Sequence, residues 1–108
     1  MQTKITQAFL IAFFIAISYN IIMYEVIYAK SAKQNLNKMQ LAKVAQIIAK
    51  IEEIARNPYG NHNNVTKLQG REGYRLRVGD WRILYSLNNN KLILLVLEVL
   101  PRGGAYKH

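Results

Sequence analysis

Cysteine is absent from the 108-residue sequence, so disulfide bonds and thiolate metal sites are excluded. Only two histidines are present, His62 and His108, and they do not favour a histidine metal site. The paired-carboxylate, Ser/His/Asp and phosphate-loop arrangements of many enzymes are missing as well. The sequence therefore predicts neither a metal nor a cofactor.

Acidic residues are also few, with six Asp and Glu against 15 Lys and Arg, which gives a formal net charge of +9. This excess favours a polyanionic partner such as nucleic acid or an acidic protein, with an anionic membrane surface as the third alternative. The length allows one domain near the lower size for a self-sufficient core, so a partner can contribute stability.

Residues 1–22 carry a single charge, Lys4, followed by an apolar run from Ala8 to Ile17 without helical or strand alternation. The run resembles the basic and apolar regions of a secretion signal. No small-x-small cleavage site closes it convincingly, and it is shorter than the roughly 20 residues of a membrane-spanning helix. Three interpretations remain: translation that starts at Met23, which we favour, a signal or membrane anchor, and an additional helix. We expect residues 23–108 to form the whole functional domain.

The segment Gly73–Tyr85 consists of two alternating runs joined by a tight turn at Gly79-Asp80, and it predicts a β-hairpin. This turn pairs Val78 with Trp81, Arg77 with Arg82, Leu76 with Ile83 and Tyr74 with Tyr85. One face is therefore apolar, and the other carries Arg75, Arg77 and Arg82. Directly opposed arginines are destabilising unless an anion compensates them. The hairpin predicts an anion site, with solvated surface arginines as the alternative.

Two helices are predicted between a first strand over Met23–Ala29 and the hairpin. Ser31 and Gln34 predict a capping-box start of a short helix that reaches about Lys38. The second helix ends at Asn57-Pro58. Its predicted core-facing stripe is Leu41, Val44, Ala45, Ile48, Ile51 and Ala55.

A polar loop over Pro58–Thr66, in which we expect His62 to be solvated, leads into the hairpin. After a turn at Asn88–Asn90, the apolar run Leu92–Leu100 is typical of a strand in the middle of a sheet, which Pro101 then ends. The order is strand, helix, helix, strand, strand, strand. It predicts an α+β fold in which two N-terminal helices pack on one face of a small antiparallel sheet.

The hairpin resembles the signature hairpin of the RelE/ParE superfamily of bacterial toxins. The likeness extends to Lys67-Leu68-Gln69-Gly70 upstream and to Pro101–Tyr106 downstream, and covers roughly residues 23–107. The resemblance implies a RelE-like fold and a role as the toxin of a type II toxin-antitoxin system. RelE-like members cleave messenger RNA inside the ribosome, whereas ParE-like members inhibit DNA gyrase. A non-catalytic basic module that binds RNA or protein is the third interpretation.

A residue-level match to the RelE branch implies specific roles. The implied catalytic residues are Arg77, Arg82, Arg102 and Tyr106. The implied RNA-binding residues are Lys67, Arg71, Arg75, Lys107 and His108. Guanidinium groups stabilise the charge that builds on the phosphorane when a ribose 2′-hydroxyl attacks, and the tyrosine can stack on a base. Some members have lysine where this chain has Arg77, and arginine is a poor general base, so the identity of the base stays open. His108 titrates in a suitable range.

The resemblance also implies the partners. They are a cognate acidic antitoxin, the ribosome with its messenger RNA, and operator DNA reached only through the antitoxin complex. We expect the antitoxin to cover part of the basic face or to displace the C-terminal tail. A cytoplasmic location follows from the same resemblance, and no cofactor is implied.

Overall fold

The computed structural model describes residues 7–12, 14 and 23–102. Residues 7–12 and 14 are helical, and four large apolar side chains there are exposed: Phe9, Leu10, Ile11 and Phe14. None of the helices in the described ranges has the length and hydropathy needed to cross a bilayer. Three predicted site residues lie outside the described ranges: Tyr106, Lys107 and His108.

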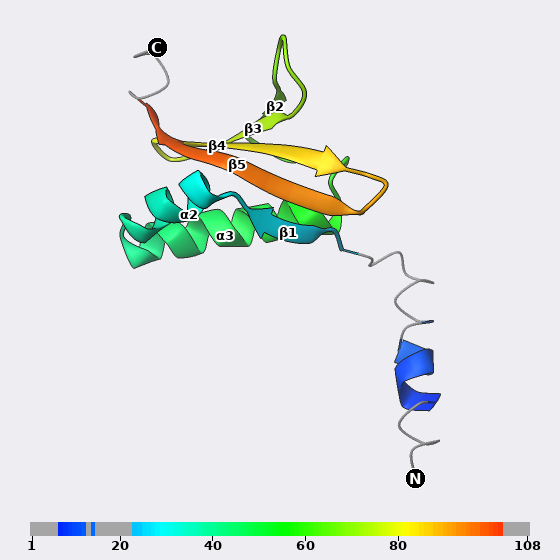
Figure 1. The fold of residues 1–108 in the computed structure, drawn as a ribbon. Helices are drawn as coiled ribbons and strands as arrows, with labels where there is room; N and C mark the ends of the chain where they lie inside the picture. Colours follow the sequence, from blue (N-terminus) through cyan, green and yellow to red (C-terminus); the bar gives the residue numbers. More distant parts are fainter. Residues whose placement is uncertain (1–6, 13, 15–22, 103–108) are drawn as a thin grey trace.

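The strands and helices of the described domain follow nearly the predicted order (Figure 1). Its elements are β1 (Glu25–Tyr28), α2 (Lys30–Asn37), α3 (Leu41–Arg56), β2 (Val65–Lys67), β3 (Tyr74–Val78), β4 (Trp81–Asn88) and β5 (Ile93–Pro101). The five strands form one sheet in the order β1-β5-β4-β3-β2, with both helices on the same face. The predicted α+β class, with two helices on one face of a small sheet, is confirmed.

Two features of the sheet differ from the prediction. β1 pairs with β5 in parallel, through bonds such as that from the Ala29 N–H to the Val96 carbonyl at 2.8 Å, so the sheet is mixed. β2 is a short edge strand within the segment predicted to be a loop, and it pairs with β3. β5 therefore lies between β1 and β4, which confirms that its apolar run belongs to an interior strand.

Helix α3 buries a stripe that only partly matches the predicted one, because Ile51 and Ala55 are buried as predicted but two other members are not. Leu41 is 85% exposed and Ala45 is also exposed, whereas Ile47 and Ile54 are buried. The stripe that faces the core runs through Val44, Ile47, Ile51 and Ile54. This stripe also has helical spacing, and it buries larger side chains than a face that includes Ala45, so more apolar surface leaves water.

The predicted capping box of the first helix is wrong. Helix α2 begins already at Lys30, and its N-terminus has no side-chain cap. The Ser31 hydroxyl donates instead to the carbonyl of Leu97 at 3.2 Å, and the Asn35 amide donates to the carbonyl of Val99 at 2.8 Å. Both side chains therefore attach α2 to β5, and tertiary hydrogen bonds replace the local cap.

The hairpin has the predicted register, with Val78 opposite Trp81 and Arg77 opposite Arg82. Gly79 allows the two-residue turn because its φ of 57° lies in the left-handed region that favours glycine. The rings of Tyr74 and Tyr85 stack with centroids 5.4 Å apart. The apolar side of the hairpin thus packs toward the helices. Its other side belongs to the sheet face that neither α2 nor α3 covers, which we call the uncovered face (Figure 1).

Candidate nucleic-acid interface

The sheet face opposite the helices carries the hairpin arginines. Arg77 lies opposite Arg82, and the neighbouring Arg75 lies opposite Leu84 on β4 and Thr66 on β2. Residues paired across antiparallel strands point to the same side of a sheet. The four strands β2 to β5 thus present a continuous surface, with its cations on the β3 and β4 portion.

Three arginines from different parts of the chain meet at the hairpin turn. The three arginines line a pocket of about 390 Å³, which we call the arginine pocket. Its lining residues are Arg77, Gly79, Asp80, Trp81, Arg82 and Arg102. The backbone N–H of Arg102 donates to the carbonyl of Asp80 at 2.7 Å, which holds the end of β5 beside the turn. The turn and this hydrogen bond together bring Arg102 to the hairpin arginines.

The three arginines of the pocket differ in their exposure to solvent. Arg82 is only 9% exposed, whereas Arg77 and Arg102 are exposed. The alternative of solvated surface arginines therefore does not hold for Arg82. Since three guanidinium groups face a single carboxylate, that of Asp80, the pocket is strongly cationic. Guanidinium forks match phosphate oxygens in pairs, so the geometry suits an anionic group such as a phosphodiester.

A smaller pocket adjoins the arginine pocket on the same face. We call it the β2 pocket; its volume is about 170 Å³, and it is lined by Asn64, Thr66, Arg75 and Arg77. Arg77 belongs to both pockets. The two pockets therefore form a continuous strip from β4 to the edge strand β2.

The other predicted RNA-binding residues of the described chain lie apart from these pockets. Lys67 is exposed opposite Tyr74, on the side of the sheet that holds the core, so the structure does not group it with the arginines. Arg71 is exposed in the turn between β2 and β3. The sequence did not identify Asp80 and Trp81 as pocket residues. Asp80 was assigned to the turn, and Trp81 was assigned to the apolar side of the hairpin.

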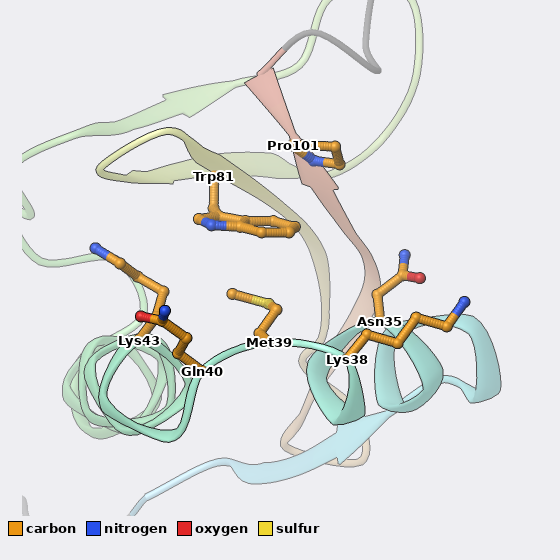
Figure 2. A pocket seen from close by; sticks show the side chains of 7 residues that line it. All are labelled: Asn35, Lys38, Met39, Gln40, Lys43, Trp81 and Pro101. Carbon is orange, nitrogen blue, oxygen red and sulfur yellow. The ribbon is translucent and has the colours of Figure 1, made fainter.

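A groove lies between the hairpin turn and the two helices (Figure 2). This helix-side groove has a volume of about 470 Å³ and is lined by Asn35, Lys38, Met39, Gln40, Lys43, Trp81 and Pro101. In Figure 2 the Trp81 and Met39 side chains face each other, and Lys38 and Lys43 stand on either side. Trp81 lines both this groove and the arginine pocket.

Comparison with known proteins gives a family match over most of the domain. Residues 26–106 match the family described as ParE toxin of type II toxin-antitoxin system, parDE. No curated protein matches the sequence significantly.

Several solved toxin structures share the fold. RelE in the archaeal RelE-RelB complex from Pyrococcus horikoshii is 27% identical, with a TM-score of 0.67 over 76% of this chain and 98% of that chain. The toxin of the RelB-RelE complex from Methanococcus jannaschii is 26% identical, with a TM-score of 0.62 over 74% and 94% of the two chains. The YoeB/ParE toxin from Agrobacterium tumefaciens, at 16% identity, has a TM-score of 0.62 over 71% and 96%. This last likeness concerns the fold alone.

Proposed function

The chain belongs to the ParE toxin family of type II toxin-antitoxin systems. We propose that it acts as a ribosome-dependent endoribonuclease that cleaves messenger RNA. The observation that carries the proposal is the convergence of Arg77, Arg82 and Arg102 on one pocket of the uncovered sheet face. A toxin that acts only by binding another protein does not require such a convergence of phosphate-binding groups.

The chemistry follows from the charge of the pocket. Attack of a ribose 2′-hydroxyl on the adjacent phosphate places additional negative charge on the phosphorane oxygens. Guanidinium groups fixed around that position stabilise the transition state more than the ground state. Burial preorganises the guanidinium group of Arg82, whereas Arg77 and Arg102 are exposed side chains of the same pocket that we assign to the phosphate as well. We assign base stacking to Tyr106 in the C-terminal tail.

The supporting cations extend the RNA path beyond the pocket. Arg75 continues the strip toward β2, and Arg71 lies in the turn beyond it. Lys107 adds a positive charge after Tyr106, and we assign His108 to RNA binding as well. Phosphate contacts of this kind set affinity and register and make binding salt-dependent.

The proposed inhibitory partner is an acidic antitoxin. Two of the similar toxins were solved in complexes with RelB, which supports a partner of this class. The helix-side groove places two apolar side chains, Trp81 and Met39, opposite each other between two lysines, which suits an apolar side chain flanked by carboxylates. We propose that the antitoxin docks there, that its complex alone binds operator DNA, and that the toxin acts in the cytoplasm.

Inhibition of DNA gyrase is the second candidate, because the matched family is described by its ParE toxin. One experiment separates the two. The full chain and its Arg102→Ala variant are induced in cells, and transcript ends are mapped during growth arrest. The ribonuclease proposal expects new ends within translated regions that Arg102→Ala removes. Growth arrest with gyrase-dependent DNA damage and unchanged transcript ends would establish the second candidate instead.

A further inference from the structure

The β2 pocket differs in chemistry from the arginine pocket beside it. Two of its four lining residues are the neutral side chains Asn64 and Thr66, and no carboxylate lines it. Its volume of about 170 Å³ corresponds to roughly five or six water molecules, which is room for one planar group rather than a whole nucleotide. A pocket for phosphate alone would need only the two arginines.

Backbone contacts place both neutral residues, Asn64 and Thr66, at the pocket. The Asn64 carbonyl accepts a hydrogen bond from the N–H of Arg77 at 2.9 Å, and Asn64 has a left-handed φ of 67°. Thr66 is held opposite Arg75 by the β2–β3 pairing. Within the described residues, the hydrogen bonds involve neither the Asn64 amide nor the Thr66 hydroxyl. Both groups are therefore available to a ligand.

We propose that the β2 pocket binds the nucleobase next to the phosphate held in the arginine pocket, and that Asn64 and Thr66 read this base. The inference rests on the proposed function, since it assumes an RNA strand on this face. Arg77 lies between the pockets and reaches the phosphate that joins the two nucleotides. Arg75 contributes a guanidinium plane on which a base can stack.

The residue types favour adenine at this position. The asparagine amide offers a donor and an acceptor side by side, and this pair complements the N6 and N7 edge of adenine. The threonine hydroxyl adapts as donor or acceptor. Because specific readout of RNA takes place on unstacked, single-stranded bases, the ligand is a single-stranded segment rather than a duplex.

Two substitutions remove the reading groups with little structural effect. Asn64→Gly deletes the amide and retains the left-handed backbone conformation that glycine adopts freely. Thr66→Val deletes the hydroxyl with nearly the same shape and suits a strand. Asn63→Gly is the matched control, because Asn63 is the neighbouring loop residue and lines a different pocket.

The test measures base preference in two ways. Transcript ends in cells give the base distribution around cleavage sites for each variant. Purified full-length chain carrying Arg102→Ala, which protects the RNA, is titrated with four short single-stranded RNAs that differ only in base. We expect the preference for adenine to fall roughly fivefold to a hundredfold in Asn64→Gly, the loss of one bidentate contact, and to stay unchanged in Asn63→Gly. Thr66→Val is expected to lower it less.

The outcomes separate this inference from the proposed function. Cleavage whose base distribution is unchanged in both Asn64→Gly and Thr66→Val overturns the base pocket and leaves the ribonuclease standing. Binding with an Asn64-dependent preference for adenine, without cleavage in cells, supports the pocket and overturns the ribonuclease. Equal binding of all four RNAs overturns the pocket whether or not the chain cleaves.

Discussion

Arg77 and Arg82 lie directly opposite each other on β3 and β4, yet only Arg82 is buried. In the sequence the two are equivalent, directly opposed cations, and such a pair is destabilising unless an anion compensates it. The structure separates them, because truncating Arg82 to alanine also removes a buried side chain and its packing. We therefore expect Arg82→Ala to lose stability. The exposed Arg77 and Arg102 are better positions at which to test the effect of removing one positive charge.

Arg77→Ala is expected to keep or raise stability. Its removal relieves a like-charge contact between directly opposed strand residues, and such pairs contribute roughly 0.2 to 1 kcal/mol. The free energy of unfolding, measured in urea, should therefore be unchanged or higher by about this amount. Arg75→Ala is the control, because Arg75 faces Leu84 and Thr66 rather than a cation. An equal gain in both variants would point to a general charge effect instead.

Arg102→Ala is expected to abolish most cleavage while leaving the fold intact. Removal of one fixed donor from a developing oxyanion costs about 2.7 to 4 kcal/mol, or roughly a hundredfold to a thousandfold in rate. The side chain is exposed, and the backbone N–H that bonds to Asp80 is retained in alanine. Cleavage rates on ribosomes measure the effect, with the exposed Arg56 of α3 as the control substitution. If the folded variant cleaves RNA at the parental rate, the assignment of Arg102 as a catalytic residue is wrong.

Much of the hairpin could be predicted because two local signals agree. Alternation assigns the faces, and a two-residue turn at Gly79-Asp80 fixes the register, so the pairing of Arg77 with Arg82 follows from sequence alone. The face of helix α3 could not be fixed in the same way. Its sequence carries two overlapping stripes of helical spacing, and only packing against the sheet decides that Ile47 is buried and Leu41 is not.

In the candidate site, too, some residues could be predicted from local sequence signals and others depend on tertiary pairing. The arginines of the hairpin were predicted as a group because alternation places them on one face. β2 was missed, since three residues of mixed polarity form a strand only when β3 is present to pair with them. Asn64 and Thr66 therefore had no assigned face. Their place beside Arg77 is a consequence of tertiary pairing.

The raised pKa of Tyr85 leads us to expect that the free energy of unfolding depends on pH in the alkaline range. Burial, with a smaller contribution from Tyr74, raises the pKa of Tyr85 from its ordinary value of 10.0 to about 12. Folding thus favours the neutral phenol, and this contribution is complete below about pH 10 and is lost as pH rises toward 12. The free energy of unfolding should fall over this range by on the order of 2 kcal/mol more in the parent than in Tyr85→Phe. Parallel pH profiles of the two proteins would contradict the assignment.

Removal of residues 1–22 is expected to leave folding and toxicity unchanged. All of the described core residues lie between Ala32 and Val99, so the shortened chain retains the packing that stabilises the sheet. Thermal unfolding and growth arrest are compared for the full chain and for residues 23–108. If the shortened chain folds with its antitoxin but loses toxicity, residues 1–22 have a functional role. If the shortened chain does not fold, residues 1–22 belong to the domain.

Trp81→Ala is expected to weaken antitoxin binding more than RNA cleavage. Trp81 is half-buried and forms the apolar wall of the helix-side groove opposite Met39, whereas its contribution to the arginine pocket is a wall without charge (Figure 2). An aromatic anchor of this kind contributes about 2 kcal/mol or more to an interface, or roughly thirtyfold in affinity. The affinity of the purified antitoxin for each variant measures the effect.

Lys43 and Leu41 provide the matched comparison for the groove. Lys43→Ala removes a charge beside the tryptophan and should lower the rate of association in a salt-dependent manner, as expected for an acidic partner. Leu41→Ala removes an exposed apolar side chain that does not line the groove, and it should change neither affinity nor rate. Because Trp81 also lines the arginine pocket, an antitoxin that binds Trp81 would lie at the edge of that pocket. If Trp81→Ala keeps full affinity for the antitoxin, the inhibitory contact does not lie in the helix-side groove, and the arginine pocket is then the expected contact.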